Sequence, residues 1–249
     1  MICRRQGKRS AQTAEETKHL ILATAGKMFC QFGYEKVSLR NISECAGVSH
    51  SLIRHHFGSK EQIWYTVSDT LNAYMQNYLQ ALIDQFPEDK PAQVVLYNFI
   101  MKLMAHMLLN PEPLQFIADA VRQEGKFFDY FIDQSGTFET ATQKLICEHN
   151  KTNPDHQIVL WEMKWQLIYT AHAAISLKPL LNKVWQPETD NQDEILLKHW
   201  SLFNQQISTM LNIKSQDKLQ PTNLRSLLLP IACDFSNSEA CSEELRKYS

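Results

Sequence analysis

Hydrophobic residues recur along this chain at the spacing of α-helices, and strict alternation of apolar and polar positions is scarce. Near the N-terminus the apolar side chains fall at i, i+4, i+7, i+8 and i+11 on one helical face, at Ile21, Ala25, Met28, Phe29 and Phe32. Prolines and glycines divide the rest into helical runs over residues 39–46, 50–56, 59–86, 92–110, 114–150, 155–185 and 190–212, with breaks in the 114–150 run near Gly125 and Gly136. The pattern predicts an all-α fold.

The N-terminal quarter of the chain carries the cap and turn residues of three short helices. Thr13 and Glu16 match a capping box that opens the first of them. Ser38 and Ser49 can each cap the helix that follows, and Gly47 can end the helix between them in a left-handed conformation. Two helices joined by a short turn with glycine form a helix-turn-helix, which places its second helix in the major groove of DNA.

The predicted second helix of this motif, residues 50–56, has two different faces. At 100° per residue one face carries His50, Ser51, Arg54 and His55, and the opposite face carries Leu52, Ile53 and His56. Arg54 can pair bidentately with guanine O6 and N7, and Ser51 can donate or accept a hydrogen bond at a base edge. The outward face therefore has the chemistry that reading a DNA groove requires. The alternative is a generic three-helix subdomain with a solvated polar face.

Charge is distributed unevenly between the two ends of the chain. Residues 1–60 carry ten Lys and Arg against four acids, a net charge of +6, so the overall charge of -2 leaves -8 for the remainder. A basic end suits a polyphosphate partner, and an acidic remainder does not. Helix N-termini also favour anions, which places Ser38, Arg40 and Lys60 as candidate phosphate contacts.

Three runs in this region resemble the tetracycline-repressor (TetR) family of transcription factors. They are Thr17-x-x-Leu-Ile-Leu-Ala-x-Ala-x-x-x-Phe29-x-x-Phe-Gly33-Tyr34, then Val37-Ser-Leu-Arg-x-Ile42-x-x-x-Ala46-Gly47-Val48-Ser49, and Phe57-Gly58-Ser59-Lys60-Glu61. The resemblance covers about residues 15–65. It implies a dimeric bacterial regulator, usually a repressor, with a helical ligand-binding and dimerisation domain after the fourth helix.

Carried over by position, the resemblance assigns DNA contacts to individual residues. It implies phosphate contacts at Ser38, Arg40, His55 and Lys60, and groove-facing positions at His50, Ser51, Leu52 and Arg54, with Ser49 as the helix cap. Three of these depart from the family pattern: His50 stands where Lys or Arg is common, Leu52 where Thr or Ala is frequent, and Arg54 where Tyr is usual. Leu52 can contact a thymine methyl group or pack inward, so the operator sequence stays open.

Two later helices carry apolar seams with the 4-3-4-3 spacing of coiled coils. One seam consists of Leu196, Trp200, Phe203, Ile207 and Met210, and the other of Trp161, Trp165, Ile168, His172 and Ile175. The resemblance, in which the last two helices dimerise, favours a four-helix interface between two copies over an intrachain core. A two-fold protein reads a pseudo-palindromic operator whose half-sites lie about one helical turn apart.

The resemblance also implies a small-molecule effector pocket among the middle helices. The aromatic and neighbouring side chains that we expect to face it are Tyr74, Tyr78, Phe99, Leu103, His106, Phe116, Phe127, Phe131, Trp165 and Tyr169. Such a lining suits a bulky apolar or cationic ligand, although side chains at this spacing also build ordinary cores. The hypothesis is that the ligand tilts the fourth helix and changes the separation of the two recognition helices.

These predictions divide the chain into a basic arm at 1–12, a DNA-binding domain at 13–60, an effector and dimerisation domain at 61–213 and a tail at 214–249. The tail reads as loop with a short docking segment at Leu227, and its role is open. It is the one feature that favours an alternative function, an adaptor of the same fold whose main partner is another protein, with DNA as co-ligand.

Other classes of function find no support in the sequence. Ser/His/Asp elbows, P-loops and dinucleotide glycine fingerprints are absent, so we expect no enzyme and no cofactor. The histidines do not stand at metal-ligand spacing, and the six cysteines show no C-x-x-C pair, so we expect no metal and a reduced chain. No run approaches 18 continuous apolar residues, so we expect a cytoplasmic protein without a membrane span.

Overall fold

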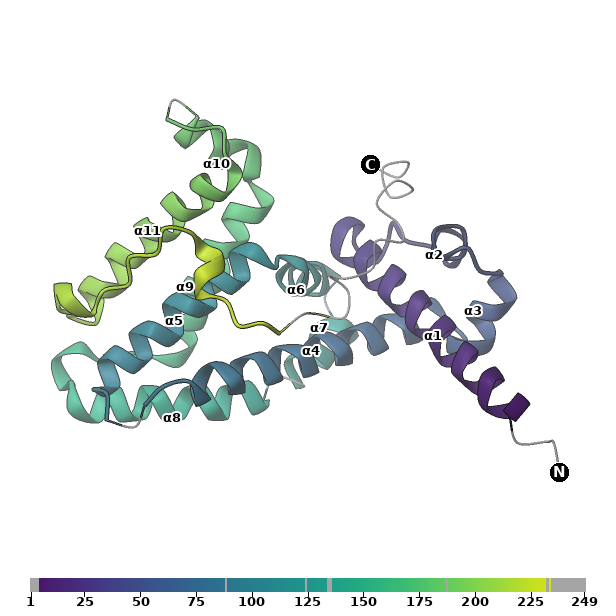
Figure 1. Ribbon diagram of the computed structural model, residues 1–249, viewed down its shortest axis with the longest axis horizontal. Helices are drawn as coiled ribbons and strands as arrows, with labels where there is room; N and C mark the ends of the chain where they lie inside the picture. Colours follow the sequence, from purple (N-terminus) through teal and green to yellow (C-terminus); the bar gives the residue numbers. More distant parts are fainter. Residues whose placement is uncertain are drawn as a thin grey trace. The chain divides into compact units, whose positions relative to one another are not determined.

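The computed structural model describes residues 5–87, 89–123, 125–133, 136–186, 188–231 and 233. Every regular element in these ranges is helical, which confirms the all-α prediction (Figure 1). The α-helices are α1 (Arg5–Phe32), α2 (Leu39–Ala46), α3 (His50–Phe57), α4 (Lys60–Asp84), α5 (Ala92–Leu109), α6 (Glu112–Gln123), α7 (Lys126–Asp133), α8 (Gly136–Thr152), α9 (Leu160–Ser176), α10 (Lys178–Trp185) and α11 (Gln192–Met210). Three 3₁₀ turns complete the list: η1 (Pro154–His156), η2 (Ser215–Asp217) and η3 (Leu224–Leu227).

The chain forms two compact units. Unit 1 contains residues 1–74, 115–131 and 231–249, and unit 2 contains residues 75–114 and 132–230. Helix α4 therefore contributes its first part to unit 1 and its second part to unit 2, as one continuous helix.

In unit 1, α1 packs against α2 and α3 to form a small three-helix core. Ile21, Phe29, Ile42 and Ile53 are at most 1% exposed in this core, because each lies on the apolar face of its amphipathic helix. The first helix begins at Arg5, so the capping box expected at Thr13 is not its start. The Thr17 hydroxyl instead donates to the Thr13 carbonyl within the helix, since good helix formers continue the helix towards the N-terminus.

In unit 2, α5 is the central helix and packs against α8, α9, α11 and η3. It is long and apolar enough to cross a membrane by length and composition, with a mean hydropathy of 1.4, which the absence of an 18-residue apolar run did not indicate. However, 61% of this window is buried inside the protein, as expected for the core helix of a globular unit. The Trp200 indole of α11 is buried beside it and donates to the Met101 carbonyl at 2.9 Å.

The expected helix over 155–185 is divided into three pieces. Pro154 begins the η1 turn, α9 starts only at Leu160, and a break at Leu177 separates α9 from α10. Pro179 stands in the first turn of α10, where its missing N–H costs nothing.

Residues 214–230, which we call the C-terminal strap, pack onto unit 2 (Figure 1, yellow). The Tyr97 hydroxyl donates to the Asn204 side chain at 2.7 Å and accepts the Leu219 N–H at 2.9 Å. Leu224 and Leu227 in η3 are buried, at 3% and 9% exposed. The strap is thus part of the hydrophobic core of unit 2.

Candidate nucleic-acid interface

The turn between α2 and α3 is fixed by caps at both ends of α2. The Ser38 hydroxyl accepts the Asn41 N–H at 3.1 Å, and the Asn41 side chain accepts the Ser38 N–H at 2.9 Å. Gly47 ends the helix at φ 64°, and the Ser43 hydroxyl donates to the Val48 carbonyl at 2.6 Å. These bonds satisfy the free backbone groups of a short helix and set the direction of the chain into α3.

Helix α3 begins at the Ser49 cap, whose hydroxyl accepts the Leu52 N–H at 3.2 Å. Its inner face carries Ile53 and Phe57, both buried in unit 1, and its outer face carries the exposed residues His50, Ser51, Arg54 and His55. Leu52 and His56 are half-buried at the border between the two faces. The division into faces follows the expected periodicity, and the DNA contacts assigned to these residues stay predictions.

Positive charge is available on the exposed side of the motif. Arg54 is exposed and has no side-chain hydrogen bond or ion pair within the described ranges. Arg40 pairs with Glu44 at 2.8 Å, where both side chains are exposed to solvent. An exposed pair of this kind contributes little to stability.

Lys60 begins α4, as the sequence predicted, and its side chain turns back to the loop after α1. Its ammonium group donates to the Tyr34 and Val37 carbonyls, each at 3.0 Å, and lies 3.9 Å from the centre of the Tyr34 ring. Burial lowers the pKa of Lys60, and Glu35 partly offsets the effect. The side chain therefore joins the loop after α1 to the start of α4, and the phosphate contact expected of Lys60 stays a prediction.

Unit 1 also contains an aromatic cluster, formed by Trp64 of α4, Phe116 of α6 and Phe127 of α7. The Trp64 ring stacks on Phe116 at 4.9 Å between centroids and contacts Phe127 at 4.2 Å. Trp64 is fully buried, and the Tyr130 hydroxyl donates to Asp69 at 2.6 Å beside it. Phe116 and Phe127, which we expected in an effector pocket, thus belong to the core of the unit that carries α3.

A buried carboxylate joins α6 to the end of α1. The Asp119 side chain, 9% exposed, accepts the Tyr34 N–H at 2.7 Å and lies 3.5 Å from Arg122. Gly33 lies so close to it that a Cβ there would stand 2.5 Å from the Asp119 Oδ1 atom. The sequence predicted the end of this helix at Gly33 but not its contact with Asp119, because the two lie 86 residues apart.

The other expected pocket residues do not share one site. Tyr74 is buried in unit 1, whereas in unit 2 the Tyr78 ring lies 3.9 Å from that of His106, with Leu103 also buried. Trp165 and Tyr169 are 66% and 41% exposed on α9, outside any enclosed lining. The Phe131 side chain lies outside the described residues. The periodicity could not assign aromatic side chains to core, cavity or surface.

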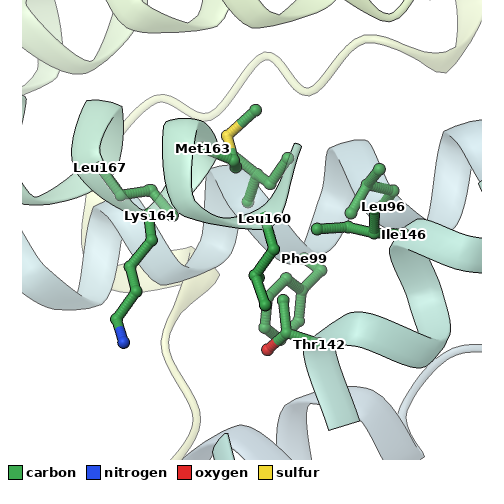
Figure 2. A pocket seen from close by; sticks show the side chains of 9 residues that line it. Leu96, Phe99, Thr142, Ile146, Leu160, Met163, Lys164 and Leu167 are labelled. Atoms are coloured by element: carbon green, nitrogen blue, oxygen red, sulfur yellow. The ribbon is translucent and has the colours of Figure 1, made fainter. Parts of the chain in front are cut away.

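Unit 2 contains an apolar cavity between α5, α8 and α9 (Figure 2). It is lined by Leu96, Phe99, Ile100, Thr142, Ile146, Leu160, Met163, Lys164 and Leu167. Its volume of about 10 Å³ is near that of one water molecule. Of the expected pocket residues, only Phe99 lines this cavity. The sequence analysis missed the other lining residues because most of them are aliphatic and look like ordinary core positions.

The seam expected on α11 is largely an intrachain core. Trp200, Phe203 and Ile207 are 1%, 2% and 0% exposed within unit 2, which corrects their assignment to a dimer interface. Leu196 and Met210 are half-buried, as are Ile168, His172 and Ile175 on α9. Trp161 remains available on α9, at 54% exposed.

Metal and thiol chemistry find little basis in the described part of the chain. No group of three or more metal-ligating side chains occurs there. Cys147 is an exposed free thiol, whereas Cys45 is disulfide-bonded. The expectation of a fully reduced chain is therefore wrong at Cys45.

Comparison with known proteins adds family evidence to this geometry. A family model of bacterial regulatory proteins of the tetR family matches residues 21–64. The chain is 27% identical over 129 residues to the HTH-type transcriptional repressor AcnR of Corynebacterium glutamicum, across 49% of this chain and 60% of that protein. It is 30% identical over 98 residues to AcnR of Corynebacterium diphtheriae, across 39% of this chain and 43% of that protein. The chain thus spans 60% or less of these relatives' length.

Solved structures show the same fold. A putative fatty acid metabolism regulator of Clostridium perfringens has a TM-score of 0.53 at 14% identity, across 78% of this chain and 97% of that one. The TetR family transcriptional regulator PfmR of Thermus thermophilus has a TM-score of 0.50 at 16% identity, across 77% of this chain and 97% of that one.

Proposed function

We propose that this chain, whose residues 21–64 match the family model of bacterial regulatory proteins of the tetR family, regulates transcription by binding DNA. The observation that carries the proposal is the outer face of α3, where His50, Ser51, Arg54 and His55 are exposed on a helix fixed by caps. A short capped helix with an exposed polar face is the element that a helix-turn-helix places in the major groove. Arg54, with no competing acidic partner in the described ranges, is suited to pair with guanine.

The proposed form is a homodimer acting as a repressor. An apolar surface on α9, α10 and α11 supports dimerisation: Trp161, Trp165, Tyr169, Leu180, Val184 and Leu202 are 41–66% exposed. Monomeric proteins rarely leave several large apolar side chains exposed on neighbouring helices, and a two-fold interface would bury them. The repressor assignment rests on the likeness to AcnR.

Unit 2 is the proposed site of effector binding, which would release the repressor from DNA. The cavity between α5, α8 and α9 gives a starting point, since its lining is apolar apart from Thr142 and Lys164. A ligand that opens it would move helices of the unit in which the second part of α4 lies. The first part of α4 belongs to unit 1 and the second part to unit 2, so a movement of unit 2 would act directly on a helix of the DNA-binding unit.

Selection of bound fragments from random duplex DNA, at about 150 mM salt, tests the DNA-binding proposal. We expect an enriched inverted repeat, with half-sites about one helical turn apart. Salt is held fixed because phosphate contacts dominate affinity. An absence of enrichment would overturn the proposal and favour the protein-binding adaptor.

Arg54→Ala and Arg225→Ala give a matched pair for this experiment. Arg54→Ala should lose about 1–3 kcal/mol on the selected sequence and relax the preference at one base pair of each half-site. Arg225 is also exposed but lies in the C-terminal strap, so Arg225→Ala should bind as the wild type does. Equal losses in both variants would show that α3 is not the reading element.

A further inference from the structure

The outer face of α3 carries two histidines among its four exposed residues. His50 and Arg54 are four residues apart, as are Ser51 and His55, so they form two neighbouring rows on the helix surface. His50 stands in the first turn, beside the Ser49 cap, where helix N–H groups also attract anions. Two of the four exposed residues on the face proposed to meet DNA are therefore histidines.

The charged groups around these histidines are already accounted for. On α3 itself the His55 ring lies 5.4 Å from that of His56, and Arg54 adds a fixed positive charge. On α2, Arg40 and Glu44 pair with each other, and at the start of α4, Glu61 pairs with Lys126. The titratable side chains described on α1 are Glu15, Glu16, Lys18, His19 and Lys27. Within the described ranges, no hydrogen bond or ion pair joins His50 or His55 to an acid.

The phosphates of bound DNA would place negative charge beside His50 and His55. A histidine ordinarily changes charge between about pH 5 and 8, and a nearby phosphate favours its protonated form. We infer that binding of DNA by this protein is coupled to proton uptake at His50 and His55, so that operator affinity rises as the pH falls. This inference rests on the DNA-binding function proposed above and describes the regulation of that same site.

The sign of the effect follows from the direction of the coupling. A histidine whose pKa is raised by DNA contributes affinity that is fully present below the pKa of the free protein and is lost above the pKa in the complex. If DNA raises the pKa of a histidine by one unit from its ordinary value of about 6.5, affinity changes about sixfold between pH 8 and pH 6. With both histidines coupled, the expected change is about fortyfold at constant salt.

The experiment measures dissociation constants at pH 6, 7 and 8, using the duplex selected above or, without one, a random-sequence duplex. His50→Gln and His55→Gln keep a polar side chain but do not titrate. Each should reduce the pH dependence about sixfold, and the double variant should bind equally at pH 6 and 8. His156→Gln changes an exposed histidine of unit 2 and should keep the full dependence. A double variant with the wild-type profile would overturn the inference.

A second measurement uses only the wild-type protein, so it holds even if a variant fails to fold. Calorimetric titration with the same duplex at pH 6.5, in buffers of different ionisation enthalpy, gives the number of protons taken up. We expect uptake of one to two protons, and a value of zero contradicts the inference. DNA binding without proton uptake overturns only this inference, whereas no binding at any pH overturns the proposed function as well.

Discussion

At the scale of single residues, the contact between Gly33 and Asp119 joins two segments of unit 1 that are far apart in the sequence. Gly33 has φ +81°, and its Cα approaches a carboxylate that also holds the Tyr34 N–H. Two requirements therefore meet at one position: a left-handed backbone, and space that a methyl group would fill.

Gly33→Ala should destabilise the protein by about 3 kcal/mol. The left-handed backbone accounts for about 1 kcal/mol, and displacement of Asp119 from its charged hydrogen bond for about 2 kcal/mol more. Gly47→Ala is the matched control, because Gly47 has φ +64° but nothing within 4 Å of the added Cβ. Urea denaturation measures both, and equal losses would show that the Asp119 contact contributes nothing.

His106 gives a prediction for the pH dependence of stability. Burial lowers its pKa to about 4, so the folded state binds fewer protons than the unfolded state between about pH 6.5 and pH 4. The free energy of unfolding should therefore fall as the pH falls through this window, by up to about 3 kcal/mol.

His106→Gln removes this titration and is the comparison for urea denaturation at pH 4.5 and 7.5. The variant is expected to be less stable at pH 7.5, because Tyr78 loses its ring contact, but to lose less stability on acidification. An identical pH slope in both proteins would mean that His106 is not responsible. The window lies mostly below the range used for DNA binding, so the two pH effects can be separated.

At the scale of elements, local chemistry determined what could be predicted. Ser38, Gly47 and Ser49 lie within three residues of the helix ends that they cap, so the sequence alone located α2 and α3. The α11 seam could not be assigned, because a 4-3-4-3 spacing is the same for a coiled coil and for an intrachain core. Its true partner, α5, lies about a hundred residues earlier, and only tertiary packing reveals it.

The C-terminal strap shows that a segment without helical periodicity can also belong to the core. Its sequence has no helical periodicity and reads as loop, yet Leu224 and Leu227 are buried and Tyr97 binds its backbone. The segment around Leu227, which the sequence analysis gave as a short docking segment, thus packs onto unit 2 of the same chain.

Leu224→Ala should therefore destabilise the protein by about 2–4 kcal/mol, through lost burial and the cavity left behind. The neighbouring Arg225→Ala should change stability by less than about 0.5 kcal/mol, because its ion pair with Asp193 is exposed. Thermal denaturation distinguishes the two. A neutral Leu224→Ala would indicate that the strap is not part of the core.

At the scale of the whole molecule, α9, α10 and α11 expose large apolar side chains to water, which is unfavourable and which packing within one chain does not cover. The helices expose these residues because Trp200, Phe203 and Ile207 already fill the core side of α11. The coiled-coil spacing thus identified helices with apolar faces, while burial decides which face is left for a second copy.

Trp165→Glu tests whether this surface joins two copies. Trp165 is 66% exposed, so the substitution leaves the core of unit 2 unaffected, but it would place a charge in the proposed interface. We expect sedimentation equilibrium to give a dimer for the wild type and a monomer for Trp165→Glu. Val121→Glu, which changes a 47% exposed residue of α6 in unit 1, should remain a dimer.

Because a monomer engages only one half-site, Trp165→Glu should also lose affinity for an inverted repeat while keeping its affinity for a single half-site. A variant that stays dimeric would move the proposed interface away from α9, and a wild type that is monomeric at micromolar concentration would contradict dimerisation itself.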